Sequence, residues 1–354
     1  GASNVAVGDK ALCANTTGTE NVGVGSLSLD ANTTGNYNVA VGANSLSANT
    51  TADNNVGIGV AALLTNTTGA SNTAVGRHSL RLNTTGCRNT AIGMESMYSN
   101  TSGENNIAMG QSALEANTTG DFNVALGVKA LDANTTGNGN TAVGFCSLTA
   151  ITTATCNTAV GHNSLEALTT AEYTVGIGHK SGVGVTTGAC NTLIGNYAGY
   201  NLTTGYRNIA IGTNPQFSSV SACGQNVIGY DEVGKGDNTS FLDGSSGVFN
   251  KSNSTTWNQT SDRRIKKNIV DNTTGLEKIT QIQVRNFEYR TLDEITDFGE
   301  HKKSAVVKKE GIQVGAIAQE IELIFPELVT TQTTGVKTVD PGNLTWYMIN
   351  AIKE

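Results

Sequence analysis

Short apolar segments recur along the first two thirds of the chain at a fixed spacing of seventeen residues. The first unit, NVAVGDKALCANTTGTE, starts at Asn4, and the next, NVGVGSLSLDANTTGNY, starts at Asn21. Thirteen units follow one another without insertion or deletion, and the last starts at Asn208. In each unit Val, Thr, Ile, Leu or Met fills positions two and four, with Ala, Gly or Leu between them. This alternation predicts a short strand with one buried face in every unit.

The remaining positions of the unit predict how the chain turns. Position five is Gly in every unit, which indicates either a positive φ or a close approach of another backbone. NTTG is typical of a turn. A strict short period with strand signals predicts that each unit is one coil of a parallel β-solenoid. Coils rise by about 4.8 Å each, so the rod would be roughly 60 Å long. Stacked Asn at positions one and twelve would form hydrogen-bonded ladders.

The leucine at position nine suggests an oligomer. Leu fills this position in nine of the first ten units, and Met97 fills it in the other. Seventeen residues allow two short strands and about three inward apolar side chains. The free energy gained by burying so few side chains barely offsets the conformational entropy lost when the coil is ordered. We therefore expect the leucines to face another chain, most simply in a parallel trimer. The alternative is a monomeric solenoid with the leucines inside.

Charge divides the chain at Ser261. Residues 1–260 hold 9 Lys and Arg and 15 Asp and Glu. The last 94 residues hold 13 Lys and Arg and 14 Asp and Glu. We expect a repeat shaft at 1–225, a β connector at 226–260 and a small α/β domain at 261–354. In the last domain we expect a helix around Leu276, Ile279 and Ile282, a strand in VRNFEYR, a helix that ends near Pro326, and a final helix in NLTWYMINAIKE. The unfinished apolar stripe of that helix suggests that the protein continues beyond Glu354.

The repeats resemble two known families. NTAVGFCSL and NTAIGMESM resemble the head repeats of YadA-type trimeric adhesins, and are closer to the NTAxG…NTTG repeats of phage-type tail-fibre proteins. This resemblance covers about residues 4–220 and implies a left-handed parallel β-roll in three copies. The last units depart from the pattern, because Gly182, Gly199 and Gln216 replace the leucine. We expect the packing between chains to change there.

Residues 261–354 resemble the self-cleaving intramolecular chaperone domain of endosialidase-type phage tailspikes, which also occurs in the myelin regulatory factor family. The stretches that carry this resemblance are SDRRIKKNI and, some fifty residues later, VGAIAQEIELIFPELV. The resemblance implies a domain that trimerises the chain, helps the stalk to fold and then cuts itself off. It places the nucleophile at Ser261 and the catalytic lysine at Lys266, with Asp262 and Arg264 at the other fixed positions of the motif.

The chemistry is sound for these residue types. A serine hydroxyl needs a base, and a lysine can serve if burial or nearby cations lower its pKa. Ser261 could attack the carbonyl of Thr260 in an acyl shift, after which water would release the ester. The cut would fall on one side of Ser261, next to Thr260 or next to Asp262. Alternatively, SDRRIKKNI is a solvated basic run in which Ser261 caps a helix.

Several other kinds of site are not expected. The net charge of −7 comes without a basic stripe, which argues against nucleic acid as a partner. The longest apolar runs are too short for membrane insertion. The six cysteines have irregular spacing and no CxxC motif, so we expect mostly free thiols and neither a disulfide scaffold nor a metal site. No cofactor is expected. His162 and His179 fill position six of adjacent coils and should stack at the surface.

The NTT and NTS motifs match the N-glycosylation acceptor pattern, although a structural turn ladder is the alternative. The candidate acceptors are Asn15, Asn32, Asn49, Asn66, Asn83, Asn100, Asn117 and Asn134.

These patterns favour a structural fibre of viral type, located on the virion surface or extracellular. We expect a homotrimer that could bind a glycan or protein of the host cell surface. Enzymatic activity would be limited to single-turnover self-cleavage, with no external substrate. A bacterial trimeric surface adhesin is the first alternative. An ice-binding solenoid is a weaker one, because adjacent threonines point to opposite faces of a strand.

Overall fold

The computed structural model describes residues 1–234, 236–242, 248–251, 269, 272, 275–297, 310–331, 336–339 and 341–353. The chain forms two compact units, Gly1–Thr260 and Ser261–Glu354, which are considered separately.

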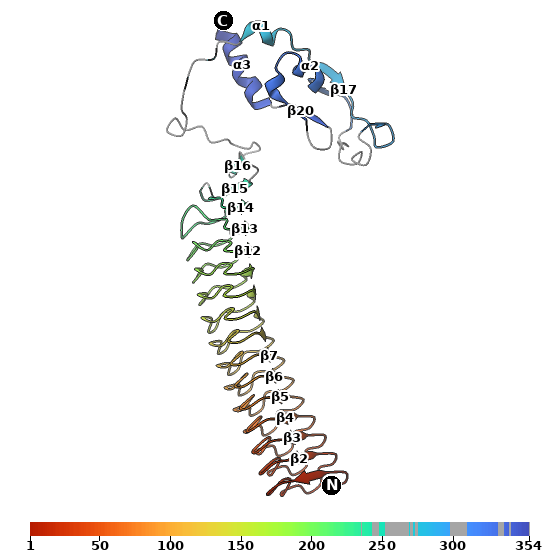
Figure 1. Ribbon diagram of the computed structural model, residues 1–354, viewed down its shortest axis with the longest axis vertical. Helices are drawn as coiled ribbons and strands as arrows, with labels where there is room; N and C mark the ends of the chain where they lie inside the picture. The colour runs from red at the N-terminus through yellow and green to blue at the C-terminus, as the bar shows by residue number, and fades with distance from the viewer. Residues whose placement is uncertain are drawn as a thin grey trace. The chain divides into compact units, whose positions relative to one another are not determined.

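The first unit is a parallel β-solenoid with one strand in each coil (Figure 1). Strands pair in sequence order, and each residue lies beside the one seventeen positions later, as Val5 lies beside Val22. The coils therefore stack without any shift along the strand. The strands are β1 (Val5–Val7), β2 (Val22–Val24), β3 (Val39–Val41), β4 (Val56–Ile58), β5 (Thr73–Val75), β6 (Thr90–Ile92), β7 (Ile107–Met109), β8 (Val124–Leu126), β9 (Thr141–Val143), β10 (Thr158–Val160), β11 (Val175–Ile177), β12 (Thr192–Ile194), β13 (Ile209–Ile211), β14 (Asn226–Ile228), β15 (Thr239–Leu242) and β16 (Val248–Lys251).

The predicted fold class is confirmed, since the chain is mainly β and builds a parallel solenoid with seventeen-residue coils. The expectation of two strands in each coil was wrong. Each coil of the repeat contributes one strand of three residues, and the rest of the coil consists of turns that bond to the next coil through backbone groups. In coil three, for example, the Leu46 amide donates to the Ala62 carbonyl at 3.0 Å.

The glycine at position five meets both conditions that the sequence suggested. From Gly8 to Gly212, φ at this position lies between 129° and 143°, a region that side chains disfavour. A Cβ there would also lie within 2.6 Å of the carbonyl oxygen of the same glycine in the next coil. The invariant glycine lets the backbone turn sharply at the end of the strand while adjacent coils stay in contact.

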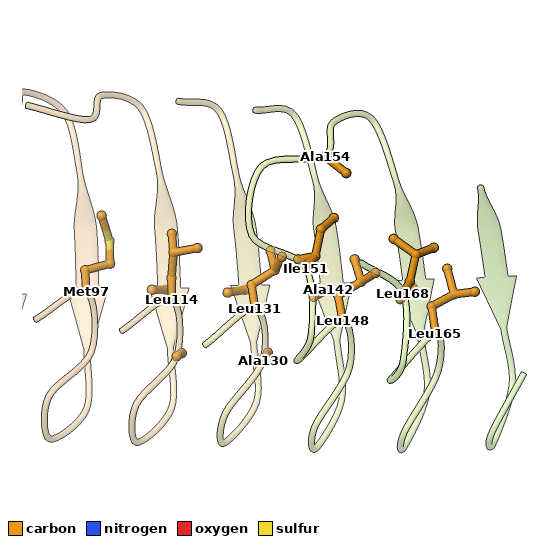
Figure 2. Packing of buried hydrophobic residues seen from close by; sticks show 14 of the residues in the cluster. Met97, Leu114, Ala130, Leu131, Ala142, Leu148, Ile151, Ala154, Leu165 and Leu168 are labelled. Carbon is orange, nitrogen blue, oxygen red and sulfur yellow. The ribbon is translucent and has the colours of Figure 1, made fainter. Parts of the chain in front are cut away.

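The leucine column lies inside a single chain, so its predicted role between chains was wrong. Leu29, Leu46, Leu114 and the other members are fully buried, apart from Leu12 in the first coil, which is 8% exposed. Figure 2 shows Met97, Leu114, Leu131, Leu148 and Leu165 in successive coils, within one hydrophobic cluster. The small residue at position three packs in the same cluster, as Ala142 does. The interior is therefore the face of the small strand residue, and the larger residues at positions two and four point away from it.

Each leucine of this column has a left-handed backbone conformation, with φ near 50° in Leu46 and Leu165. This conformation costs an ordinary side chain roughly 1–2 kcal/mol. Burying a leucine side chain contributes about 1.5–3 kcal/mol, which offsets that cost. The column therefore stabilises a turn that its own residues disfavour.

The departures from the leucine pattern in the last coils are compensated within the chain. Gly182 and Gly199 keep the left-handed conformation, with φ of 59° and 63°. Leu193 replaces the usual small residue at position three of the coil that holds Gly199. It fills the freed volume, since a Cβ on Gly182 would lie 2.6 Å from Leu193 Cδ1 and a Cβ on Gly199 would lie 2.8 Å from Leu193 Cδ2. The sequence predicted that packing between chains changes in these coils. The structure shows instead that packing changes in the core of a single chain.

Two asparagine ladders run along the interior, as the sequence predicted. At position one, the backbone nitrogen of Asn38 donates to Asn21 Oδ1 of the preceding coil at 2.9 Å. At position twelve, Asn83 Nδ2 donates to Asn66 Oδ1 at 2.7 Å and to the Gly86 carbonyl at 3.0 Å. The second ladder ends at Asn134, because Ile151 fills position twelve of the next coil and leaves Asn134 Oδ1 buried without a partner.

Replacing Asn83 with alanine is expected to destabilise the first unit by about 2–4 kcal/mol, because it opens a cavity and leaves Asn66 Oδ1 buried without its donor. Thermal unfolding followed by circular dichroism measures the loss. Thr85→Ala, at an exposed position two residues later, is the matched control and should change stability by less than about 0.5 kcal/mol. Equal effects of the two substitutions would argue against a stabilising ladder.

The stack continues beyond the thirteen units counted in the sequence. β14 pairs with β13 at the same seventeen-residue spacing, and Gly229 has the positive φ of position five. The next coil is shorter, because Asn226 lies beside Ser240. β16 then pairs with β15 in the antiparallel direction, which ends the parallel sheet.

Within the described residues of the second unit there are three short α-helices and two small antiparallel sheets. β17 (Arg285–Phe287) pairs with β18 (Gln313–Gly315), and β19 (Val329–Thr331) pairs with β20 (Lys337–Val339). The helices are α1 (Leu276–Ile279), α2 (Ala318–Glu322) and α3 (Pro341–Lys353), with the 3₁₀ helix η3 (Pro326–Leu328). The predicted strand in VRNFEYR is confirmed, and a helix occurs in each of the three predicted places. However, α1 ends at Ile279 and does not reach Ile282, and α2 ends at Glu322, four residues before Pro326.

Candidate functional site

The residues of the predicted cleavage site lie outside the part of the chain that the structure describes. These residues are Thr260, Ser261, Asp262, Arg264 and Lys266. Their roles as scissile residue, nucleophile, supporting residues and base therefore stay predictions.

The described core of the second unit is formed around the second stretch of the chaperone resemblance. Ile321, Phe325 and Leu328 are buried, and Ile279 and Leu344 pack against them. The helices α1 and α3 are also joined through Phe325, because its ring lies 4.7 Å from that of Tyr347 and 5.1 Å from Lys278 Nζ. VGAIAQEIELIFPELV thus supplies the hydrophobic centre of this unit.

An ion pair joins the first sheet of this unit to α2. Arg285 Nη2 lies 2.9 Å from Glu320 Oε1, and Arg285 Nε donates to Glu320 Oε2 at 3.2 Å. This contact raises the pKa of the Arg285 guanidinium. The pair borders an open hollow of about 270 Å³ lined by Gln281, Gln283, Arg285, Glu320, Ile321, Leu323 and Ile324. None of these lining residues is a serine or lysine, so the hollow is not a Ser-Lys site in itself.

Large apolar side chains remain exposed on the second unit. Val284, Ile312 and Val314 lie on one face of the β17–β18 sheet, and Trp346 and Ile352 lie on α3. A sheet of two strands is marginally stable by itself. An exposed apolar face on such a sheet indicates a surface that another protein surface covers.

The outward face of the long sheet is an extended apolar surface of the first unit. Positions two and four hold only Val, Ile, Leu, Met or Thr in all thirteen coils, with no charged residue. Many of these side chains are between 36% and 58% exposed in the single chain, namely Val5, Val7, Val41, Ile58, Ile92, Ile107, Met109, Ile177, Ile209, Ile211 and Ile228. We call this surface the outward strand face.

Position ten has a different character, because it holds charged residues in several coils. Asp30, Glu115 and Glu166 are examples, and all three are partly exposed. The contrast with position ten shows that the absence of charge is particular to the outward strand face, which indicates that another surface covers this face. The alternating pattern shows that positions two and four share a face, but it does not show whether that face lies inside or outside the chain.

The candidate N-glycosylation residues form the ladder at position twelve. Asn32, Asn49, Asn66, Asn83, Asn100, Asn117 and Asn134 are fully buried, and Asn15 is partly buried. Their Nδ2 atoms, which would carry a sugar, donate to the carbonyl three residues later, as from Asn100 to Gly103 at 3.1 Å. The folded coil therefore leaves no room for a glycan at the seven buried positions, and the geometry favours the turn ladder.

Two histidines stack as the sequence predicted. The His162 and His179 rings are exposed, with centroids 5.4 Å apart, and Phe145 stacks on His162 at 5.2 Å. Among the described residues, no group of three or more His, Cys, Asp or Glu side chains is placed to hold a metal ion. The six cysteines are free thiols. Within the described ranges, no helix has the length and apolar character needed to span a membrane.

Comparison with protein families identifies the C-terminal region. Residues 261–330 match the model of a family described as the chaperone of endosialidase. Searches of curated proteins and of solved structures gave no match. A β-solenoid followed by a domain of this family fits a protein of the tail-fibre type, and the predicted recognition is confirmed. The likeness of the repeats to YadA-type heads stays a prediction.

Proposed function

We propose that the chain is the shaft of a viral fibre or spike and works as a homotrimer. The observation that carries this proposal is the uncharged outward strand face, which runs the length of the solenoid in a chain that also holds a chaperone-of-endosialidase domain. Three chains would pack with these faces toward one another and the charged position-ten sides toward water. We place the fibre on the virion surface or in another extracellular setting, where it would contact the host surface.

The outward strand face supports an oligomer for an energetic reason. Each coil presents Val, Ile, Leu, Met or Thr at two outward positions. Burying a fully exposed aliphatic side chain contributes about 1.5–3 kcal/mol, and because the more exposed of these side chains are 36–58% exposed in the single chain, each would contribute roughly half of that. Summed over thirteen coils, this term is large compared with the stability of a typical domain. The solenoid has its own leucine core, so the trimer stabilises a coil that is already closed.

The C-terminal domain would set the alignment of the three chains. Parallel pairing between distant segments is slow, and a repeat of constant length can pair out of register by whole coils. A domain that trimerises first would fix the register of three shafts before their outward faces meet. The exposed apolar residues of the second unit, such as Val314 and Trp346, support a role in contacts between chains.

The domain would then release the shaft by self-cleavage. Lys266, as a neutral amine, would accept the hydroxyl proton of Ser261, and Ser261 Oγ would attack the Thr260 carbonyl carbon. The Thr260–Ser261 amide bond breaks as the ester forms, and the freed Ser261 amine takes a proton. Water then hydrolyses the ester to give a carboxylate at Thr260 and the serine hydroxyl. Each chain would react once.

Ser261→Ala is expected to leave one chain of 36.6 kDa on a denaturing gel, where the unmodified protein gives two products. The substitution removes the nucleophile, so the shaft stays joined to the C-terminal domain. Ser254→Ala, a serine outside the motif, is the control and should cut like the unmodified chain. Cleavage that persists in Ser261→Ala, or no cleavage in the unmodified protein, would contradict the proposed reaction.

A further inference from the structure

We infer that the shaft binds an uncharged glycan on one edge, between Phe122 and Tyr173. This inference rests on the proposed role in host-surface contact and names the surface and the partner. The edge is formed by positions sixteen and seventeen of each coil, immediately before the strand. Phe122 and Tyr173 fill position seventeen in coils seven and ten.

The two rings lie where the backbone disfavours them. Phe122 has a φ of 58° and Tyr173 a φ of 55°, and bulky side chains are rare in this left-handed region. Position seventeen has this conformation in the other coils as well, at lower cost with Asn54 and at a similar cost with Tyr37 and Arg88. The repeat therefore imposes the conformation, and it gives no reason for an aromatic residue at these two places.

Burial does not account for the rings either. Phe122 is 64% exposed and Tyr173 is 60% exposed. No aromatic ring contacts them in the described part of the chain, whereas Phe145, on another turn of the coil, stacks on His162. Two large rings that the repeat neither requires nor buries are available for contact with another molecule.

The stretch between the rings leaves them accessible. Position seventeen holds Gly139 and Cys156 in the two intervening coils, and both are small. A Cβ on Gly139 would have a single neighbour within 4 Å, the Cys156 Sγ at 3.8 Å. The two aromatic residues lie three coils apart, about 14 Å at the usual spacing of strands.

Polar groups line the same stretch. Position sixteen holds Asp121, Asn138, Thr155 and Glu172 in the four coils. Asn138 Oδ1 accepts the Asp121 amide at 2.6 Å, and Glu172 Oε1 accepts the Thr155 hydroxyl at 3.3 Å. Each of these side chains has further donor or acceptor capacity. Exposed threonines at position fourteen add a parallel row of hydroxyl groups.

This combination fits a glycan better than a protein. Aromatic faces can pack on the apolar faces of pyranose rings, while amide, carboxylate and hydroxyl groups bond to sugar hydroxyls. A protein partner would need a desolvated apolar centre, whereas these two rings are isolated among polar groups. The charged groups beside the rings are the carboxylates of Asp121 and Glu172, which disfavour an anionic ligand. The next carboxylate along this edge, Glu104, is paired with Arg88. The partner class is therefore a neutral glycan.

The test compares the full chain with its Phe122→Asn/Tyr173→Asn variant on a printed panel of neutral oligosaccharides and their sialylated counterparts. We expect the unmodified protein to bind neutral members in preference to sialylated ones. The variant should lose about tenfold or more in apparent affinity, because each ring supplies a stacking contact. Its melting temperature should not fall, since asparagine suits the left-handed conformation and no buried contact is lost.

Phe145→Asn removes an exposed ring from a different turn of the coil and is the matched control; its binding should stay within about twofold of the unmodified protein. Equal binding by the double variant, binding to sialylated glycans alone, or no binding by the unmodified protein would overturn the inference. A lower melting temperature or a lost trimer in the double variant would assign the rings a structural role. The mass in solution is read separately, so a trimer without glycan binding contradicts the inference and leaves the proposed shaft intact.

Discussion

Replacing Gly93 with alanine, which adds a single methyl group, is expected to disrupt the solenoid strongly. Gly93 has a φ of 131°, and a Cβ there would lie 2.5 Å from the Gly110 carbonyl oxygen and 2.7 Å from its carbon. Both obstacles are backbone atoms, which cannot move aside without separating two coils. We expect a loss of about 3–5 kcal/mol, from a disfavoured backbone and overpacking together, measured by thermal or urea unfolding.

Gly139→Ala is the matched control for this effect. Gly139 has an ordinary left-handed φ of 65° and lies on the exposed edge, where a Cβ would make only a contact of normal length. This substitution should cost about 1–2 kcal/mol, the usual penalty for a side chain in that conformation. Similar losses in the two variants would show that close stacking at position five does not control stability.

The second large effect is expected on the outward strand face. Ile58→Asp/Ile107→Asp should prevent assembly, because each trimer would have to bury six carboxylates without partners. The effective penalty for burying an ion is several kcal/mol, and removing the isoleucines also forfeits their apolar burial. Both residues are about 40% exposed in the single chain, so the coil itself should tolerate the change. Sedimentation equilibrium measures the mass, and circular dichroism shows whether the coils remain folded.

Thr51→Asp/Thr85→Asp adds the same charges at exposed turn positions and should leave the mass unchanged. If Ile58→Asp/Ile107→Asp also kept the mass of the unmodified protein, the outward strand face would not be the interface. If Ile58→Asp/Ile107→Asp unfolded while Thr51→Asp/Thr85→Asp stayed folded, the unfolding would come from the change on the strand and not from the added charge.

Much of the shaft could be predicted because its period is visible in the chain. The constant spacing of Gly8, Gly25 and their equivalents gave the coil length, and the same residues indicated the tight backbone that the structure shows. The position of asparagine in each unit was enough to predict both ladders. These features depend on identical residues stacking on one another, which a strict repeat enforces.

The face on which the leucine lies could not be predicted in the same way. Alternation in a strand shows that positions two and four share a side, but it does not show which side is inside. The answer depends on the left-handed turn at position nine, which aims Leu46 and its equivalents into their own coil. With that volume filled, only a small residue such as Ala40 fits at position three, and the larger strand residues are left outside.

The same limit explains the last coils. Gly182 and Gly199, considered alone, suggested a change in the interface between chains. The residue that compensates for them, Leu193, lies eleven residues from Gly182 and six from Gly199, so the sequence does not show that they pack together. Only the folded coil brings these positions together. In the C-terminal domain, helical spacing predicted the helices, and the motif predicted the family. The placement of Ser261 and Lys266 relative to one another depends on tertiary contacts that spacing does not encode.

The most direct measurement of the central claim is the mass of the Ser261→Ala protein in solution, where the shaft and C-terminal domain stay joined. We expect three times the chain mass of 36.6 kDa, independent of concentration over the micromolar range. A stable single chain, soluble with its valines and isoleucines uncovered, would contradict a trimeric shaft.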